Sequence, residues 1–158
     1  MNSKILPISP EQALSRLSRL CSRSEKSVFD LRKKLSDWNF SLQEAETIIK
    51  KLQAAGFVDD RRYAKAFVHD KSTLARWGRL KIYNALKNKQ IEPSIINETL
   101  AALDNLLIKE NLAHLLTIKK KNMTTLPFIK QKAKLLRFAL SRGYNYEEAR
   151  EAIDAIDY

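Results

Sequence analysis

The chain has few of the residues that interrupt regular structure or carry out chemistry. Its 158 residues include only three glycines, four prolines, two histidines and one cysteine. So few glycines and prolines disfavour a sheet protein with many tight turns and therefore favour helices. One cysteine cannot close an internal disulfide, which agrees with a reducing compartment. Cys21 is interpreted as a small helix residue of the core rather than as a nucleophile.

Long apolar runs are also missing. The longest run is only a few residues, so no segment has the length of a membrane-spanning helix. Residues 1–7 lack the sustained apolar stretch of a signal peptide. We therefore expect a cytoplasmic protein without a membrane partner. With 44% hydrophobic and 30% charged residues, the composition is that of a folded protein rather than a disordered one.

No group of residues in the sequence suits catalysis, a metal or a cofactor. His69 and His114 are far apart, and a metal site needs clustered ligands. The three glycines are isolated from one another and cannot form a phosphate-binding loop. Asp59 and Asp60 stand where a helix is expected to begin, which indicates a cap and a helix-dipole partner rather than an acid/base pair. The sequence therefore predicts neither an enzyme nor a bound cofactor.

Positive charge is plentiful and unevenly distributed. The net charge is +11, and residues 76–142 hold fourteen Lys and Arg against four acids, whereas residues 143–158 hold one Arg against five acids. A basic middle segment favours polyanionic or acidic partners, although an ordinary basic surface remains the alternative. Trp38 and Tyr144 lie in or beside the core positions of the repeat and are interpreted as packing residues, whereas Trp77 is the more open candidate for stacking on a base. The predicted binding residues are Arg76, Arg79, Lys81, Lys87, Lys89, Lys130, Lys134, Arg137 and Arg142, of which Lys130, Lys134 and Arg137 share one helix face.

Apolar residues recur at a period near 3.6 along most of the chain, which predicts helices and no strands. Ser9 and Ser41 precede two of these helices, each with Gln or Glu three residues later, as in a capping box. Glu92 and Asn145 occupy the cap positions equivalent to Ser41. Gly56 is expected to end one helix.

The apolar pattern repeats about every fifty residues. Shifts of 51 and then 53 residues place apolar positions on apolar positions in three copies. The predicted divisions are an N-terminal segment and helix (1–23), repeats at 24–74 and 75–122, and a third repeat at 123–158 that ends before a third helix. We expect an all-α fold, an elongated array of three tandem three-helix repeats with an N-terminal helix.

Two blocks of the sequence resemble the RecX family. Residues 56–64, Gly-Phe-Val-Asp-Asp-Arg-Arg-Tyr-Ala, are similar to the signature at the end of that family's first unit, and residues 78–91 are similar to its second block. The resemblance extends over residues 11–156. It departs from the family at Asn39 and Gln90, where the family commonly has glycine. The residues that carry the resemblance are Gly56, Phe57, Asp59, Asp60, Arg62, Tyr63, Ala64, Gly78, Ile82 and Leu86.

The resemblance implies a regulator of the RecA recombinase. Proteins of this family bind RecA and its DNA filament, and usually damp its ATP hydrolysis and strand exchange during DNA repair and homologous recombination. The expected partners are therefore RecA and, as a further candidate, single- or double-stranded DNA, with the chain acting as a monomer. A long basic array could lie in the helical groove of the filament, which is a hypothesis.

Two alternatives stay open at this point. Three-helix units resemble helix-turn-helix domains, so the chain could bind DNA without RecA. Against this, no predicted helix carries a cluster of Arg, Asn and Gln suited to reading bases. The other alternative is a helical scaffold for a different acidic protein, as helical repeat proteins often are.

Overall fold

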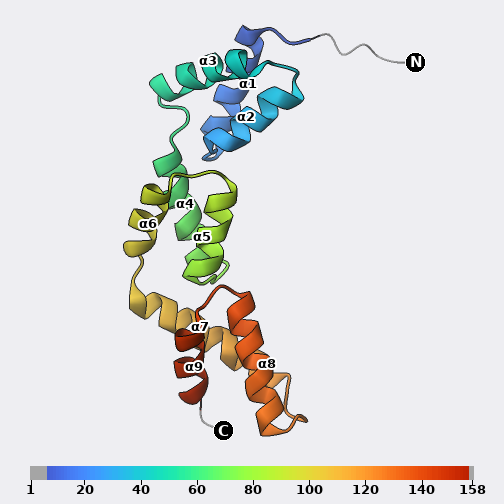
Figure 1. The fold of residues 1–158 in the computed structure, drawn as a ribbon, viewed down its shortest axis with the longest axis vertical. Helices are drawn as coiled ribbons and strands as arrows, with labels where there is room; N and C mark the ends of the chain where they lie inside the picture. Colours follow the sequence, from blue (N-terminus) through green and yellow to red (C-terminus); the bar gives the residue numbers. More distant parts are fainter. Residues whose placement is uncertain (1–6, 157–158) are drawn as a thin grey trace, which may run out of the picture. The chain divides into compact units, whose positions relative to one another are not determined.

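The computed structural model describes residues 7–156, and every regular element within that range is helical (Figure 1). The prediction of an all-α fold is therefore confirmed. Predictions made for residues 1–6 and 157–158 lie outside the described range. The helices of this range are α1 (Pro10–Arg23), α2 (Val28–Asp37), α3 (Leu42–Ala54), α4 (Asp60–Thr73), α5 (Arg79–Asn88), α6 (Pro93–Ala101), α7 (Asn105–Lys121), α8 (Phe128–Ser141) and α9 (Tyr146–Asp154).

Several of these helices begin with a capping box, in which the N-cap side chain and the third helical residue satisfy each other's backbone N–H. The predicted caps Ser9, Ser41 and Asn145 are confirmed. Ser27 caps α2 in the same way. Glu92 stands at the N-cap of α6 as predicted, but its side chain makes no capping hydrogen bond. Local sequence signals therefore mark the starts of α1, α2, α3 and α9.

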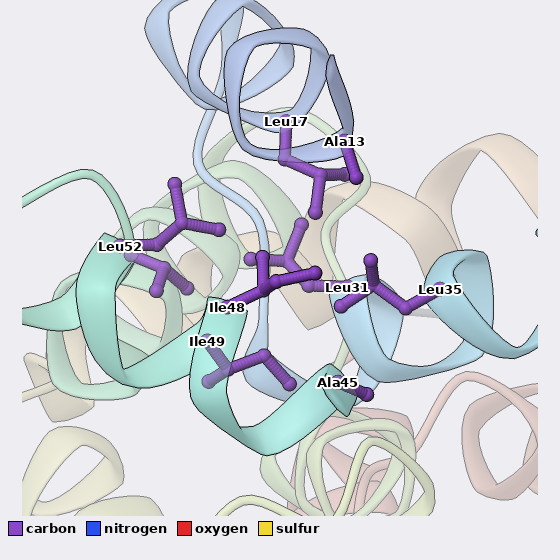
Figure 2. Packing of buried hydrophobic residues seen from close by; sticks show 9 residues of the cluster. Ala13, Leu17, Leu31, Leu35, Ala45, Ile48, Ile49 and Leu52 are labelled. Atoms are coloured by element: carbon purple, nitrogen blue, oxygen red, sulfur yellow. The ribbon is translucent and has the colours of Figure 1, made fainter. Parts of the chain in front are cut away.

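The chain divides into two compact units. The first runs to Ala66 and includes Lys89–Ile91, and the second comprises Phe67–Asn88 and the residues from Glu92 onward. In the first unit, α1 and α2 both pack against α3. Their apolar side chains point toward one another around a single core (Figure 2). The labelled members of this core are Ala13, Leu17, Leu31, Leu35, Ala45, Ile48, Ile49 and Leu52, all at most 3% exposed.

In the second unit, α7, α8 and α9 pack against one another in pairs, and α5 packs against α6. The core of the α7–α9 group includes Leu112 and Leu116 of α7 and Leu135 of α8. Its bulkiest fully buried side chain is Tyr144, which lies in the turn between α8 and α9. This burial agrees with the sequence interpretation of Tyr144 as a packing residue.

Each of these two cores joins three helices, and each group begins one helix earlier than the predicted repeat. Helix α1, predicted to precede the first repeat at 24–74, shares a core with α2 and α3. Helix α7, predicted to close the repeat at 75–122, shares a core with α8 and α9, so this last group has three helices. A period of about fifty residues is the same for either grouping, because periodicity alone does not show which helix begins a unit.

The shifts of 51 and 53 residues align Phe40, Ile91 and Tyr144, and the residue before each of them has the same backbone conformation. Asn39, Gln90 and Gly143 have φ of 64°, 55° and 96°, in the left-handed region that favours glycine. Asparagine and glutamine thus adopt here the conformation that glycine has at position 143. The departure from the family pattern at Asn39 and Gln90 therefore leaves this feature of the turn unchanged.

Candidate partner-binding surface

In the second unit, the residues that begin α5 touch the turn between α8 and α9. The Gly78 N–H donates to the Arg142 carbonyl oxygen at 2.8 Å, and the Leu80 N–H donates to the Gly143 carbonyl oxygen at 3.0 Å. A Cβ atom on Gly78 would lie 2.3 Å from the carbonyl carbon and oxygen of Gly143. Only glycine fits at so close an approach of two backbones.

Two predicted binding residues support the same contact. The Arg142 guanidinium donates through Nη2 to the Ala75 carbonyl oxygen. The Tyr144 hydroxyl donates to the Arg76 carbonyl oxygen at 2.8 Å, and burial raises the pKa of Tyr144 to about 12. The guanidinium of Arg142 and the backbone of Arg76 are therefore engaged inside the unit.

Arg79 is also engaged inside the second unit. Its Nη2 donates to Asn105 Oδ1 at 2.8 Å and to the Leu103 carbonyl oxygen at 3.2 Å. Its Nη1 lies 3.7 Å from Glu148 Oε1. The rigid fork of donors on one arginine thereby connects the first residue of α5 with the start of α7 and with α9.

Lys89 belongs to the first unit and pairs with α2. Its Nζ lies 2.5 Å from Asp30 Oδ1 and 5.7 Å from the centre of the Phe29 ring. Burial alone would raise the pKa of Asp30, but hydrogen bonds from Lys89 and Ser27 outweigh it and hold this pKa below its usual range. The lysine therefore holds residues 89–91 against the start of α2.

The ring of Trp77 is half-buried and has two ammonium groups beside it. Lys81 Nζ lies 4.4 Å and Lys71 Nζ 4.6 Å from the ring centre. Phe67 packs against the ring edge to face, with 6.3 Å between ring centres. These cation–π contacts occupy the ring that the sequence offered as a candidate for stacking on a base.

The exposed face of α8 carries the other predicted residues of the basic segment. Lys130, Lys134 and Arg137 are all exposed, and their side chains make no recorded ion pair or hydrogen bond within residues 7–156. Ile129 and Leu140, 80% and 43% exposed, lie next to them on the same helix. One face of α8 thus presents a strip of cations beside exposed apolar side chains.

The nine predicted residues therefore fall into two groups. Arg76, Arg79, Lys81, Lys89 and Arg142 make contacts inside their own unit. Lys87, Lys130, Lys134 and Arg137 extend into solvent. Whether residues of either group bind a partner stays a prediction.

Polar residues of the 56–64 block connect the start of α4 to the start of α2, within the first unit. Asp59 accepts from the N–H groups at the first turn of α4. Asp60 Oδ1 accepts from the Val28 N–H at 2.8 Å. Burial and the neighbouring Asp59 raise the pKa of Asp60, although this hydrogen bond opposes the shift. Arg62 Nε donates to Glu25 Oε1 at 2.7 Å.

The remaining residues of the two blocks serve the backbone or the interior. Gly56 ends α3 with φ of 78°. Phe57 packs against the core of the first unit, and burial raises the pKa of Tyr63 to about 12. Ala64, Ile82 and Leu86 are fully buried. These blocks are therefore explained by folding, without any contact to a partner.

Within the described range, no three His, Cys, Asp or Glu side chains come together in a way that could hold a metal ion. Cys21 is only partly buried, and burial raises the pKa of its thiol. None of the described helices combines the length and the apolar character needed to cross a membrane.

Comparison with known proteins gives the same family as the two sequence blocks. A family model described as "RecX, second three-helix domain" matches residues 59–100, which contain α4, α5 and all but the last residue of α6. The regulatory protein RecX of Actinobacillus pleuropneumoniae serotype 5b (strain L20) is 32% identical over 148 residues, covering 92% of this chain and 93% of that protein. The chain belongs to the RecX family. Regulatory protein RecX of Chlorobium phaeobacteroides (strain BS1) is 30% identical over 143 residues, covering 87% and 89%.

Solved RecX structures share the fold. A crystal structure of regulatory protein RecX has a TM-score of 0.83 and 22% sequence identity, and covers 92% of this chain and 71% of that one. The crystal structure of RecX from Lactobacillus salivarius has a TM-score of 0.81 and 18% identity, and covers 92% and 94%. At these identities the likeness supports the fold, a series of helical units.

This RecX-family chain also has a basic groove that was not predicted from the sequence. In the first unit, α1 and α2 border a cavity of about 310 Å³. The i, i+3, i+7 spacing of its arginines was a visible signal, but these residues lie outside the most basic segment, 76–142. The cavity is lined by Arg16, Arg19, Leu20, Arg23, Lys34 and Trp38.

A mainly apolar groove lies in the second unit of the RecX-family chain. It has a volume of about 520 Å³ and runs between α7 and α9. Ile108 and Leu112 form one wall, and Ala152 and Ile156 form the other. Nothing in the sequence pattern had pointed to it, because the residues that line it also belong to helices with ordinary amphipathic spacing.

Proposed function

We propose that this chain binds RecA and its DNA filament and lowers the ATPase and recombinase activities of the filament. It acts by binding rather than by catalysis, as a monomer in the bacterial cytoplasm. Membership of the RecX family supports the proposal, since the similar proteins are named regulatory proteins. The observation that carries it is the exposed face of α8.

That face has the chemistry of a protein-binding surface. Lys130, Lys134 and Arg137 extend over about 10 Å along the helix, at a rise of about 1.5 Å per residue. Because no acid of the described chain pairs with them, they attract acidic groups of a partner. The adjoining Ile129 and Leu140 supply apolar surface of the kind found at the centre of protein interfaces.

The test removes the three charges of α8 in the variant Lys130→Gln/Lys134→Gln/Arg137→Gln. Each protein is titrated into RecA assembled on single-stranded DNA while ATP hydrolysis is measured. If each charged contact contributes about 0.5–1 kcal/mol, the variant needs roughly tenfold or more protein for equal inhibition. A matched control, Lys33→Gln/Lys50→Gln/Lys51→Gln, removes the same charge from exposed positions on α2 and α3. The control should inhibit within about twofold of the unmodified chain.

Two results would overturn the proposal. The first is an unmodified chain that neither binds the filament nor changes its ATP hydrolysis at any ratio. The second is an α8 variant that inhibits as well as the control, which would remove the α8 face from the mechanism. Binding to a different acidic protein in the absence of RecA would favour the scaffold alternative instead.

A further inference from the structure

The groove between α1 and α2 in the first unit gathers cations on both of its sides. Arg16, Arg19 and Arg23 lie on one face of α1, at i, i+3 and i+7, and all three are exposed. Lys34 of α2 and Trp38, the C-cap residue four positions later, form the opposite wall. No acidic side chain lines this cavity of about 310 Å³.

The basic groove continues into a neighbouring cavity. This second cavity, of about 300 Å³, shares Leu20 and Lys34 with the first and is bordered by Lys26. Its one acid, Asp30, has its Oδ1 2.5 Å from Lys89 Nζ and is thereby neutralised. The result is a continuous track of positive charge, a shape that suits a linear polyanion better than a small isolated ion.

The mutual repulsion of these arginines is unfavourable to α1 itself. Like charges at i, i+3 and i, i+4 destabilise a helix, and the three arginines make no recorded ion pair within residues 7–156. The pair α7 and α8 in the second unit shows that the repeat does not require arginines there. At that pair Leu115 and Leu136 pack on the core, and Lys119 Nζ lies 5.1 Å from the centre of the Phe138 ring.

We propose that the groove between α1 and α2 binds the phosphate backbone of single-stranded nucleic acid directly, with Trp38 stacking on a base. Arginine guanidinium groups bind phosphate oxygens in pairs, and aromatic side chains beside a basic track are the usual platform for unpaired bases. The ring of Trp38 packs in part against the core of the first unit and is partly exposed. It has one cation beside it, Arg16 Cζ at 5.9 Å from the ring centre, whereas Trp77 has two, at 4.4 and 4.6 Å. An acidic peptide would use the arginines but would gain less than a base from the partly exposed indole.

This activity goes beyond the proposed regulation of RecA, because it requires neither RecA nor the face of α8. It belongs to the first unit, whereas α8 belongs to the second. The two surfaces are therefore tested by separate variants in separate assays.

The test measures binding of the full chain to a labelled oligothymidylate of about thirty nucleotides, without RecA, between about 50 and 200 mM salt. The variant Arg16→Gln/Arg19→Gln/Arg23→Gln should bind at least about tenfold more weakly at the lowest salt. Its salt dependence should be shallower by about two in log–log slope, since each phosphate contact with a single strand contributes about 0.7. The control Lys33→Gln/Lys50→Gln/Lys51→Gln has the same net charge and should keep most of the affinity and the steeper slope.

A fluorescence measurement tests the stacking. The chain has two tryptophans, so the variant Trp77→Phe leaves Trp38 as the single reporter. Its emission should be quenched by the oligonucleotide and should stay unchanged with poly-glutamate. Circular dichroism checks that each variant is folded. The three arginines are exposed, so we expect their replacement to leave the helices intact.

Any of three results overturns the inference. One is a chain that does not bind the oligonucleotide even at low salt. Another is an equal loss of affinity in the arginine variant and in its charge-matched control, which would make binding a property of net charge alone. The last is poly-glutamate that quenches Trp38 and displaces the oligonucleotide, which would assign the groove to an acidic protein segment. In each case inhibition of RecA through α8 is unaffected, so the two proposals fail independently.

Discussion

Replacing Gly78 by alanine is the sharpest test of how the second unit holds together. A Cβ atom at this position would lie 2.3 Å from the carbonyl carbon and oxygen of Gly143 and 2.5 Å from the Tyr144 nitrogen. All three are backbone atoms, so none can swing aside as the end of a flexible side chain could. The start of α5 and the α8–α9 turn must separate, which lengthens the hydrogen bonds from Gly78 to Arg142 and from Leu80 to Gly143.

The expected loss follows from those contacts. Overpacking of a tightly packed site costs about 1–3 kcal/mol, and each weakened hydrogen bond about 0.5–1.5 kcal/mol. Loss of glycine's extra freedom in the unfolded chain returns about 0.4–1 kcal/mol. We expect Gly78→Ala to lower the free energy of unfolding of the second unit by about 3 kcal/mol.

Urea unfolding measures this loss, with Trp77 as the reporter of the second unit in a Trp38→Phe background. Gly56→Ala in the first unit, followed with Trp38 in a Trp77→Phe background, is the matched control, because a Cβ atom there meets no heavy atom within 4 Å although φ is +78°. The control should cost about 1 kcal/mol from backbone strain alone. A Gly78→Ala variant within about 0.5 kcal/mol of the unmodified chain would refute the close approach as the reason for this glycine.

Two further predictions concern polar contacts inside the units. Lys89→Ala should destabilise the first unit by about 1 kcal/mol at neutral pH, a value discounted for partial exposure. Because the folded pKa of Asp30 is lowered, its stabilisation exists above the unfolded pKa of about 4 and is lost as pH falls through the folded pKa. Urea titrations should therefore show the gap between Lys89→Ala and the unmodified chain closing in acid, and a constant gap would contradict the pairing. Tyr144→Phe should cost about 1–2 kcal/mol by leaving the Arg76 carbonyl unpaired, and should remove one of the tyrosines that titrate near 12 in absorbance; an unchanged high-pH titration would contradict that assignment.

Local signals were enough to predict the helices of this chain. Caps at Ser9, Ser41 and Asn145 and apolar residues at helical spacing are properties of short segments, and the structure confirms them. Leu31 and Leu135, placed in one column by the repeat, are both at most 1% exposed. The grouping of helices into cores was not predictable in the same way. It depends on which neighbour each apolar face selects, and a repeated pattern is unchanged when the starting helix is moved by one.

The roles of the charged residues could be assigned only from the structure, because their partners are distant in sequence. Arg142 donates to a carbonyl 67 residues away, and Lys89 pairs with an acid 59 residues away. A count of charges along the chain treats these residues and the exposed Lys130 alike. The same count passes over α1, since the acids of residues 1–75 mask its three arginines in the sum.

Within residues 7–156, the two cationic surfaces discussed above have neighbours that differ in kind. The cations of α8 lie beside exposed aliphatic side chains, which have no particular affinity for nucleic acid but are buried readily against a protein. The cations of the groove between α1 and α2 lie beside an indole, which stacks on any base. A filament of protein wound on DNA offers both kinds of surface at once. Removing charge from one surface at a time should then weaken filament binding nearly additively, since the sites lie in separate units. If the variants of one surface abolish filament binding and those of the other leave it unchanged, the second surface binds a different ligand.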